Sequence, residues 1–191
     1  MKPFALALLL ASLPLAAQTD AMPPESKAPP AQQGDMSGMK TEVKPAVKES
    51  KFLSITFRGA TTTLTLTDLV KLPQATIHVH DAHTNQDVTF TGPLVSDVLA
   101  RAGLTPSDDN HQLILHSTVI ATGADGYYVV YSGAELEQMF SGAKAIIAVM
   151  RFELPNTEGG LIQIVNTADV KPARWVHGLA SLNVMSLAQN K

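Results

Sequence analysis

The stretch at residues 123–140, GADGYYVVYSGAELEQMF, constrains the fold most, because it specifies a turn, a strand and a helix start in that order. Asp125-Gly126 is typical of a two-residue turn, and the alternation over 127–131 is typical of a strand whose successive side chains point to opposite faces. Ser132 stands three residues before Glu135, the spacing of a capping box in which hydroxyl and carboxylate each bind a backbone N–H. The sequence therefore predicts a strand that leaves a tight turn and a helix that begins at Ser132.

The remaining periodicity predicts mostly strands. Pro93 suits a first helical position, an apolar stripe follows it, and Gly103 suits a C-terminal cap. We expect the helix after Ser132 to bury one apolar face, formed by Leu136, Met139 and Phe140. Strands are expected at 52–57, 61–66, 75–80, 88–91, 112–122, 127–131, 144–150, 161–165 and 179–187, with a short helical turn at 68–71. The predicted class is α+β, with a mixed β-sheet and a few short helices.

Charge and length narrow the function classes. At 191 residues with 45% hydrophobic content, the chain has room for one ordinary domain with its own core. The net charge of -3 argues against a protein that binds nucleic acid through its phosphate backbone. Nucleic acid is therefore not an expected partner.

The first fifty residues divide into an export signal and a linker. Lys2, an apolar run at 4–15 and the small residues Ala16-Ala17 match a signal peptide over residues 1–17, so we expect a periplasmic or secreted protein. The alternative is a retained anchor, but the run is shorter than the roughly 20 residues that span a bilayer, so no span is expected after signal removal. Residues 18–50 are rich in Pro, Lys and Gln and predict a disordered linker, followed by the folded domain at 51–191.

The motif HVHDAH is the first candidate binding site. His78 and His80 lie two residues apart on an expected strand, and Asp81 and His83 follow at its end. Imidazole and carboxylate are common ligands, so this set predicts a Cu or Zn site. Met36 and Met39 in the linker could add thioether ligands for Cu(I). The alternative interpretations are a polar side of an edge strand and chance composition in the linker.

The motif DVKPARWVHG is the second candidate. Pro172 forces a turn, which should bring Lys171, Arg174 and His177 close together beside Trp175. Arginine with lysine and histidine forms a natural binding site for a phosphate or another small anion. The alternative is a surface loop whose tryptophan packs on the core while its charges stay in solvent.

Catalytic arrangements are missing from the sequence. Ser132 fits a helix cap better than a nucleophile because no G-x-S-x-G elbow surrounds it, and Glu158 has no carboxylate partner at catalytic spacing. The chain contains no cysteine, which removes disulfides, thiolate metal ligands and cysteine nucleophiles. Whether the protein is an enzyme is left open by these observations.

The order of the motifs resembles that of the molybdopterin-binding oxidoreductase domain of the sulfite oxidase-like superfamily. The resemblance covers 52–187, and the motifs that carry it are GPL at 92–94, DGY at 125–127, GL at 160–161 and RWV at 174–176. It is closest to the short exported members that consist of little else. The resemblance implies a mixed α+β domain with a pocket for a molybdenum-pterin cofactor.

The same resemblance implies which residues would form the pocket. In the larger relatives a cysteine just after the strand matching 75–80 ligates molybdenum, and here that neighbourhood reads HVHDAHTNQ. Lys171 and Arg174 match basic residues near the pterin phosphate, and we add Asp125, Tyr127 and His177 as candidate pocket residues.

Three functions are therefore expected as alternatives. The first is an accessory redox or ligand-binding protein without the metal-ligating cysteine, which binds a pterin, another small anion or an exported partner protein. The second is an exported Cu- or Zn-binding protein that uses HVHDAH. The third is a divergent molybdenum oxidoreductase.

Overall fold

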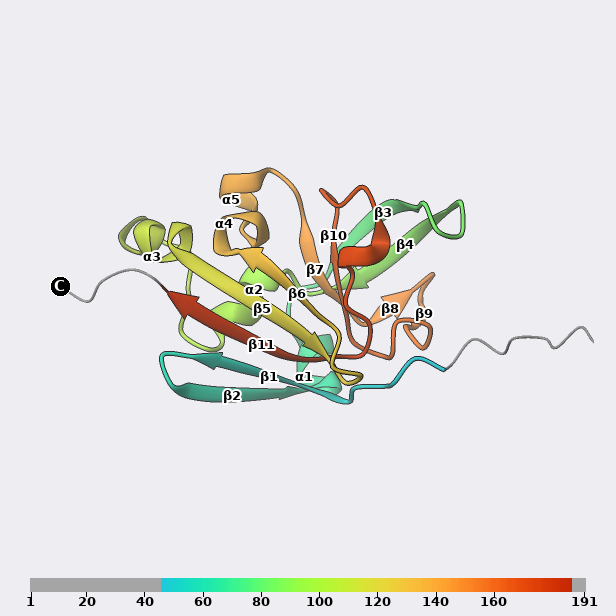
Figure 1. Cartoon of the computed structure of the whole chain (residues 1–191), viewed down its shortest axis with the longest axis horizontal. Coiled ribbons are helices and arrows are strands. Elements are labelled where there is room, and N and C mark those ends of the chain that lie inside the picture. The colour runs from blue at the N-terminus through green and yellow to red at the C-terminus, as the bar shows by residue number, and fades with distance from the viewer. Residues whose placement is uncertain (1–45, 187–191) are drawn as a thin grey trace, which may run out of the picture. The chain divides into compact units, whose positions relative to one another are not determined.

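The computed structural model of the chain describes residues 46–186 (Figure 1). The predicted signal peptide, Met36, Met39 and most of the predicted linker lie outside the described residues. Among the helices in the described part of the chain, none has the length and apolar character needed to cross a membrane.

The elements are short, and strands predominate. The strands are β1 (Phe52–Phe57), β2 (Ala60–Thr65), β3 (Ala75–Asp81), β4 (Gln86–Gly92), β5 (Ser117–Gly123), β6 (Tyr128–Ser132), β7 (Ala145–Ala148), β8 (Met150–Arg151), β9 (Leu154–Pro155), β10 (Gln163–Asn166) and β11 (Leu179–Ser186). The helices are α1 (Leu66–Lys71), α2 (Val95–Ala100), α3 (His111–Leu115), α4 (Gly133–Leu136) and α5 (Gln138–Ser141), with 3-10 turns η1 (Asp108–Asn110) and η2 (Pro172–Arg174). The predicted α+β class is confirmed.

The largest sheet is mixed and joins the two ends of the described chain. Its strand order is β2-β1-β11-β5-β6, and β1 pairs with β11 in parallel while the other neighbours are antiparallel. In β1, Leu53, Ile55 and Phe57 alternate with more exposed residues, so one face of the strand is buried. Figure 1 shows β5 and β11 running side by side through the middle of the molecule, with β1 and β2 beyond them.

The second half of the fold is built on the β3-β4 hairpin. This hairpin heads a four-stranded sheet of order β3-β4-β8-β9, and β7 pairs separately with β10. Backbone hydrogen bonds from Ile147 to Pro93 (2.9 Å) and from Val149 to Thr91 (3.0 Å) connect the segment of β7 to the end of β4. Figure 1 shows the hairpin on the side of the molecule opposite to α3.

Two apolar clusters follow from this arrangement. The larger one lies against the mixed sheet and includes Leu53, Val98 and Leu182. The smaller one lies under the β3-β4 hairpin and contains Ile77, Val88, Phe90, Ile146, Ala148, Val165 and Trp175. The tryptophan of the DVKPARWVHG motif is therefore a core residue, with 4% of its surface exposed.

Most local predictions are confirmed and some are wrong. Helix α2 begins at Val95, with Leu94 as its N-cap and Arg101 as its C-cap, so Pro93 is not the first helical residue and Gly103 lies beyond the C-cap. The hairpin of β3 and β4 and the capping box of Ser132 and Glu135 are present as predicted. Residues 112–115 form part of helix α3 and not a strand, because a short apolar run fits either structure and periodicity alone does not separate them.

The helix after Ser132 is also shorter than predicted. It divides at Glu137, whose extended backbone separates α4 from α5 and whose carboxylate accepts a hydrogen bond from the Met139 N–H. Met139 is consequently 54% exposed and does not share an apolar face with the buried Leu136.

The central position of β11 gives a stability prediction. Leu182→Ala should lower the free energy of unfolding by about 2–5 kcal/mol, because Leu182 is fully buried and its truncation leaves a cavity. Met185→Ala on the same strand is the control and should change it by about 0.5 kcal/mol or less, since Met185 is 46% exposed. Urea denaturation followed by circular dichroism measures both. Equal effects of the two substitutions would contradict the placement of β11.

Candidate functional site

A cavity of about 690 Å³ opens beside the smaller apolar cluster. Its walls come from the segment at 46–50, the β3-β4 hairpin with its turn, β8, the loop at 156–159, the start of β10 and the segment at 171–177. Its lining residues are Val47, Asp81, Ala82, His83, Thr84, Phe90, Arg151, Asn156, Glu158, Gly159, Gln163, Lys171, Pro172, Ala173, Trp175 and His177. Its size falls in the range of about 300–1,000 Å³ that is usual for small-molecule sites.

A pair of buried amides forms one part of the wall. Asn156 and Gln163 are 1% and 2% exposed, and Asn156 Nδ2 donates to Gln163 Oε1 at 3.1 Å. The side-chain oxygen Oδ1 of Asn156 in turn accepts a hydrogen bond from the backbone N–H of Gly159 at 3.1 Å. A Cβ atom at Gly159 would overlap both amides, so this position has no room for a side chain. The two amides are therefore held in fixed orientations.

Two aromatic rings form another part of the wall. Phe90 and Trp175 meet edge to face with ring centroids 5.9 Å apart. Trp175 Nε1 is buried and has no hydrogen-bond partner within residues 46–186. Because a buried N–H without an acceptor is costly, a ligand acceptor that reached Nε1 from the adjoining cavity would be stabilising.

Charged side chains complete the lining. Arg151 is 13% exposed, forms an ion pair with Glu158 and lies with its guanidinium carbon 5.4 Å from the centre of the Phe152 ring. Its Nε atom is buried without a hydrogen-bond partner in the described part of the chain. Lys171 and His177 add two further basic side chains to the lining. The cavity thus combines aromatic surface with basic groups and with the carboxylates of Asp81 and Glu158, of which Glu158 is paired with Arg151.

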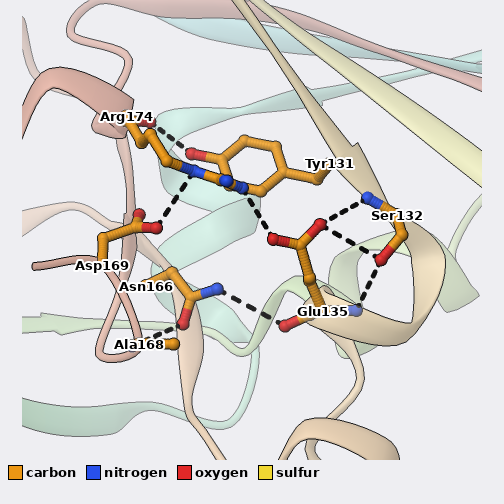
Figure 2. Close-up of polar contacts among 7 residues, drawn as sticks. All are labelled: Tyr131, Ser132, Glu135, Asn166, Ala168, Asp169 and Arg174. Atoms are coloured by element: carbon orange, nitrogen blue, oxygen red, sulfur yellow. Dashed lines mark hydrogen bonds and ion pairs between the residues drawn. The ribbon is translucent and has the colours of Figure 1, made fainter.

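Arg174 organises a cluster of charges that lies outside the cavity lining (Figure 2). Its guanidinium contacts Glu135 Oε1 at 2.8 Å and Asp169 Oδ1 at 3.0 Å, and its central carbon lies 4.7 Å from the centre of the Tyr131 ring. The Tyr131 hydroxyl donates to the backbone carbonyl of Arg174. Arg174 is thereby held from both its side chain and its backbone.

The environment changes the pKa of every ionisable group in this cluster. Burial raises the pKa of Asp169, and the positive charge of Arg174 offsets only part of that rise. Burial also acts to raise the pKa of Glu135, but hydrogen bonds from Ser132 and the charge of Arg174 outweigh it, so the pKa is lowered. Burial raises the pKa of the Tyr131 hydroxyl, so it remains a hydrogen-bond donor at neutral pH.

This cluster positions one wall of the cavity. Tyr131 holds Arg174 at the end of η2, and the Tyr127 hydroxyl donates to the carbonyl oxygen of Ala173 at 2.5 Å. Both tyrosines belong to β6 or the turn before it, so two hydrogen bonds tie η2 to the mixed sheet. Lys171 and Trp175 flank η2 and line the cavity from either end of it.

The predicted anion-binding residues are therefore divided between two places. Lys171 and His177 line the cavity as part of one wall. Arg174 does not join them, because its side chain is directed to Glu135 and Asp169. Asp125 caps its own turn by accepting the N–H of Tyr127 at 2.9 Å, and neither of these two residues lines the cavity.

The histidines of HVHDAH are also divided. His78 and His80 lie on the exposed face of β3, and their Nδ1 atoms are hydrogen-bonded across to Thr89 and Asp87 of β4, each at 2.9 Å. His83 lies in the hairpin turn and lines the cavity instead. Within residues 46–186, no group of three or more His, Cys, Asp or Glu side chains is placed to hold a metal ion. The predicted Cu or Zn site stays a prediction.

Three important cavity residues were not predicted from the sequence: Arg151, Asn156 and Gln163. Gln163 carries a signal that could have identified it, because it is the polar residue in the apolar run LIQIV and polar residues in buried strands need a partner. Arg151 carries a related signal, because it is a charged residue that comes soon after the buried apolar run of β7. Asn156 has no such local signal, because its role depends on Gln163 and Gly159.

Comparisons with known proteins give a fold and no family. No protein-family model matches the chain, and no curated protein matches it. Among solved structures, the sulfane dehydrogenase SoxCD from Paracoccus pantotrophus is similar, with a TM-score of 0.57 and 16% sequence identity. The match covers 75% of this chain and 41% of that chain. At this identity the likeness shows a shared fold alone.

The opposite pKa shifts of the two carboxylates give a prediction. Asp169 binds a proton more tightly when folded, so the wild-type protein gains stability from this group as the pH falls from above its raised pKa toward 3.8. Asp169→Asn removes that gain, so the variant should lose stability relative to wild type as the pH falls. The charged form of Glu135 stabilises the fold above 4.5 and this contribution is lost as the pH falls through its lowered pKa. Glu135→Gln should therefore approach wild type at acid pH.

Urea denaturation of the three proteins between about pH 7 and about pH 3.5 measures these differences. The expected result is two difference curves of opposite slope. If the free energy of unfolding of both variants follows that of the wild-type protein at a constant difference over this pH range, the two carboxylates are not coupled to folding through Arg174.

Proposed function

We propose that this protein is an accessory redox or ligand-binding protein that binds a small anionic heteroaromatic compound, of the phosphate-bearing pterin type, in the 690 Å³ cavity. The observation that carries the proposal is the composition of the cavity wall. Two aromatic rings, a fixed amide pair and the basic residues Arg151, Lys171 and His177 line the same space, together with the carboxylates of Asp81 and Glu158. The resemblance of the motif order to the molybdopterin domain and the fold shared with a sulfane dehydrogenase support the same class.

The residues of the cavity fit the organic part of a molybdenum-pterin cofactor. A pterin is flat and carries ring nitrogens and a carbonyl oxygen, which suit the edge of Trp175 and the amides of Asn156 and Gln163. Lys171 lies on the wall and offers a phosphate a charge-assisted hydrogen bond, and the imidazole of His177 lines the same wall. Arg151 adds a third basic group with a buried Nε donor.

The same residues do not fit the metal of that cofactor. The larger relatives that share the motif order ligate molybdenum through a cysteine thiolate, and this chain has no cysteine. The part of the cavity next to β3 offers Asp81, Ala82, His83 and Thr84 instead. The proposed function is therefore binding of the organic part without oxygen transfer.

The single tryptophan of the chain makes the proposal directly testable. Trp175 is the only tryptophan and lines the cavity, so ligand binding should change its fluorescence. We expect neopterin monophosphate to quench this fluorescence with a saturable curve, and neopterin without phosphate to bind at least about tenfold more weakly. Inorganic phosphate serves as a control for a bare anion. Absence of saturable binding by either pterin would overturn the proposed function.

Two variants locate the binding site. Lys171→Gln should weaken binding of neopterin monophosphate about tenfold, because it removes a charged hydrogen-bond donor. Lys144→Gln is the matched control, since Lys144 is exposed and lies outside the lining, and it should bind as wild type does. Trp175→Phe keeps an aromatic ring but removes the N–H, so calorimetry should show about three- to tenfold weaker binding. Equal affinities of Lys171→Gln and Lys144→Gln would place the phosphate elsewhere.

We also propose that the protein is exported, as the signal-peptide pattern at 1–17 predicts. Expression of the full chain in a Gram-negative host, followed by cell fractionation and N-terminal sequencing, tests this. The expected product lies in the periplasm or medium and begins near Gln18. A full-length product held in the cytoplasm would contradict export.

A further inference from the structure

We infer that residues 46–50 form a strap that is part of the cavity wall, and that ligand occupancy and strap docking reinforce each other. Val47 lines the cavity although it precedes the first strand. Ser50, at the other end of the strap, is 5% exposed and donates its backbone N–H to the Gly160 carbonyl at 3.0 Å. The strap therefore contacts the domain at both the cavity and the start of β1. The ligand half of this inference rests on the proposed function.

Two glycines make the docking of the strap possible. A Cβ atom at Gly178 would overlap the carbonyl oxygen of Lys48, and one at Gly160 would lie 2.8 Å from the same oxygen. Gly160 and Gly178 also approach each other, because a Cβ at Gly160 would lie 2.7 Å from the Gly178 Cα. Both have positive φ, +70° and +54°. Three backbone segments thus meet where no side chain fits.

The platform under the strap is continuous with the cavity wall. Gly160 follows Gly159, which lines the cavity and is bonded to the Asn156 amide. Gly178 follows His177, which also lines it, and the Gly178 N–H donates to the Gly159 carbonyl at 2.7 Å. A ligand that fixes the wall at 159 and 177 therefore also fixes the surface on which Lys48 rests. If the bound ligand raises the equilibrium constant for docking of the strap by some factor, thermodynamic linkage requires that a docked strap raise the affinity for the ligand by the same factor.

Tryptic cleavage at the Lys48–Glu49 bond tests the docking without any ligand. Its carbonyl oxygen is the atom packed against the two glycines, so cleavage requires that the strap leave the domain. Gly178→Ala should raise the cleavage rate about tenfold or more, because a methyl group there overlaps the Lys48 oxygen. The fragments are followed by mass spectrometry, and circular dichroism confirms that the variant is folded.

A matched control separates the clash from backbone strain. Gly59 has φ +79° but a Cβ there would meet nothing within 4 Å, so Gly59→Ala carries the same kind of strain without the contact. It should leave cleavage after Lys48 unchanged. If Gly178→Ala does not fold, Val47→Gly weakens the strap from its own side and should also raise the rate. Cleavage of Gly178→Ala or Val47→Gly at the rate of wild type and Gly59→Ala would overturn the docked strap.

The coupling is tested by repeating the digestion with neopterin monophosphate. Slower cleavage of the wild-type protein, together with weaker binding by Val47→Gly, is the expected result. If the fluorescence of Trp175 shows binding but cleavage is unchanged, the coupling is wrong and the proposed function stands. If no binding is seen, the proposed function fails and the coupling fails with it, while the docking of the strap is decided by the glycine variants.

Discussion

The contact of Arg174 with two carboxylates and a tyrosine is the interaction on which the cavity depends. Asp169 has 6% of its side chain exposed, and its Oδ2 atom is buried without a hydrogen-bond partner in the described structure. A buried carboxylate of this kind is tolerated because a guanidinium stands next to it. Glu135 binds the same guanidinium from α4, and the Tyr131 hydroxyl on β6 binds the Arg174 carbonyl. The segment that carries Lys171 and Trp175 is therefore fixed both to α4 and to the mixed sheet. The ion pairs thus support a wall of the cavity although Arg174, Glu135 and Asp169 do not line the cavity themselves.

Three glycines shape a second part of the cavity wall. Gly159, Gly160 and Gly178 lie where the loop after β9, the start of β11 and the strap come together. At each of these positions a side chain would overlap a backbone or amide atom, so close packing of main chain replaces the usual packing of side chains. Because Gly159 has no side chain, the amides of Asn156 and Gln163 pack directly against its backbone, and both residues line the cavity.

The features of the fold and of the cavity that could be predicted from the sequence are those whose residues lie close together along the chain. The capping box of Ser132 and Glu135 spans three residues and was predicted, but the second role of Glu135 links it to Arg174, 39 residues later. Lys171 and His177 were predicted because they share one motif with Pro172. Arg174 was expected beside them and has other neighbours, since nothing local shows that Asp169 and Glu135 engage its side chain. Pairs that form only in the folded chain, such as Asn156 with Gln163, leave no periodic signal.

The cavity walls also serve the core, and this explains how the cavity keeps its shape. Trp175 and Phe90 line the cavity and at the same time belong to the apolar cluster under the β3-β4 hairpin. Truncating either ring would leave a hole in that cluster, at a cost of about 3–5 kcal/mol for a buried aromatic residue. Folding therefore requires the rings whether or not a cofactor is used. The aromatic walls are therefore held in place by the packing of the core itself.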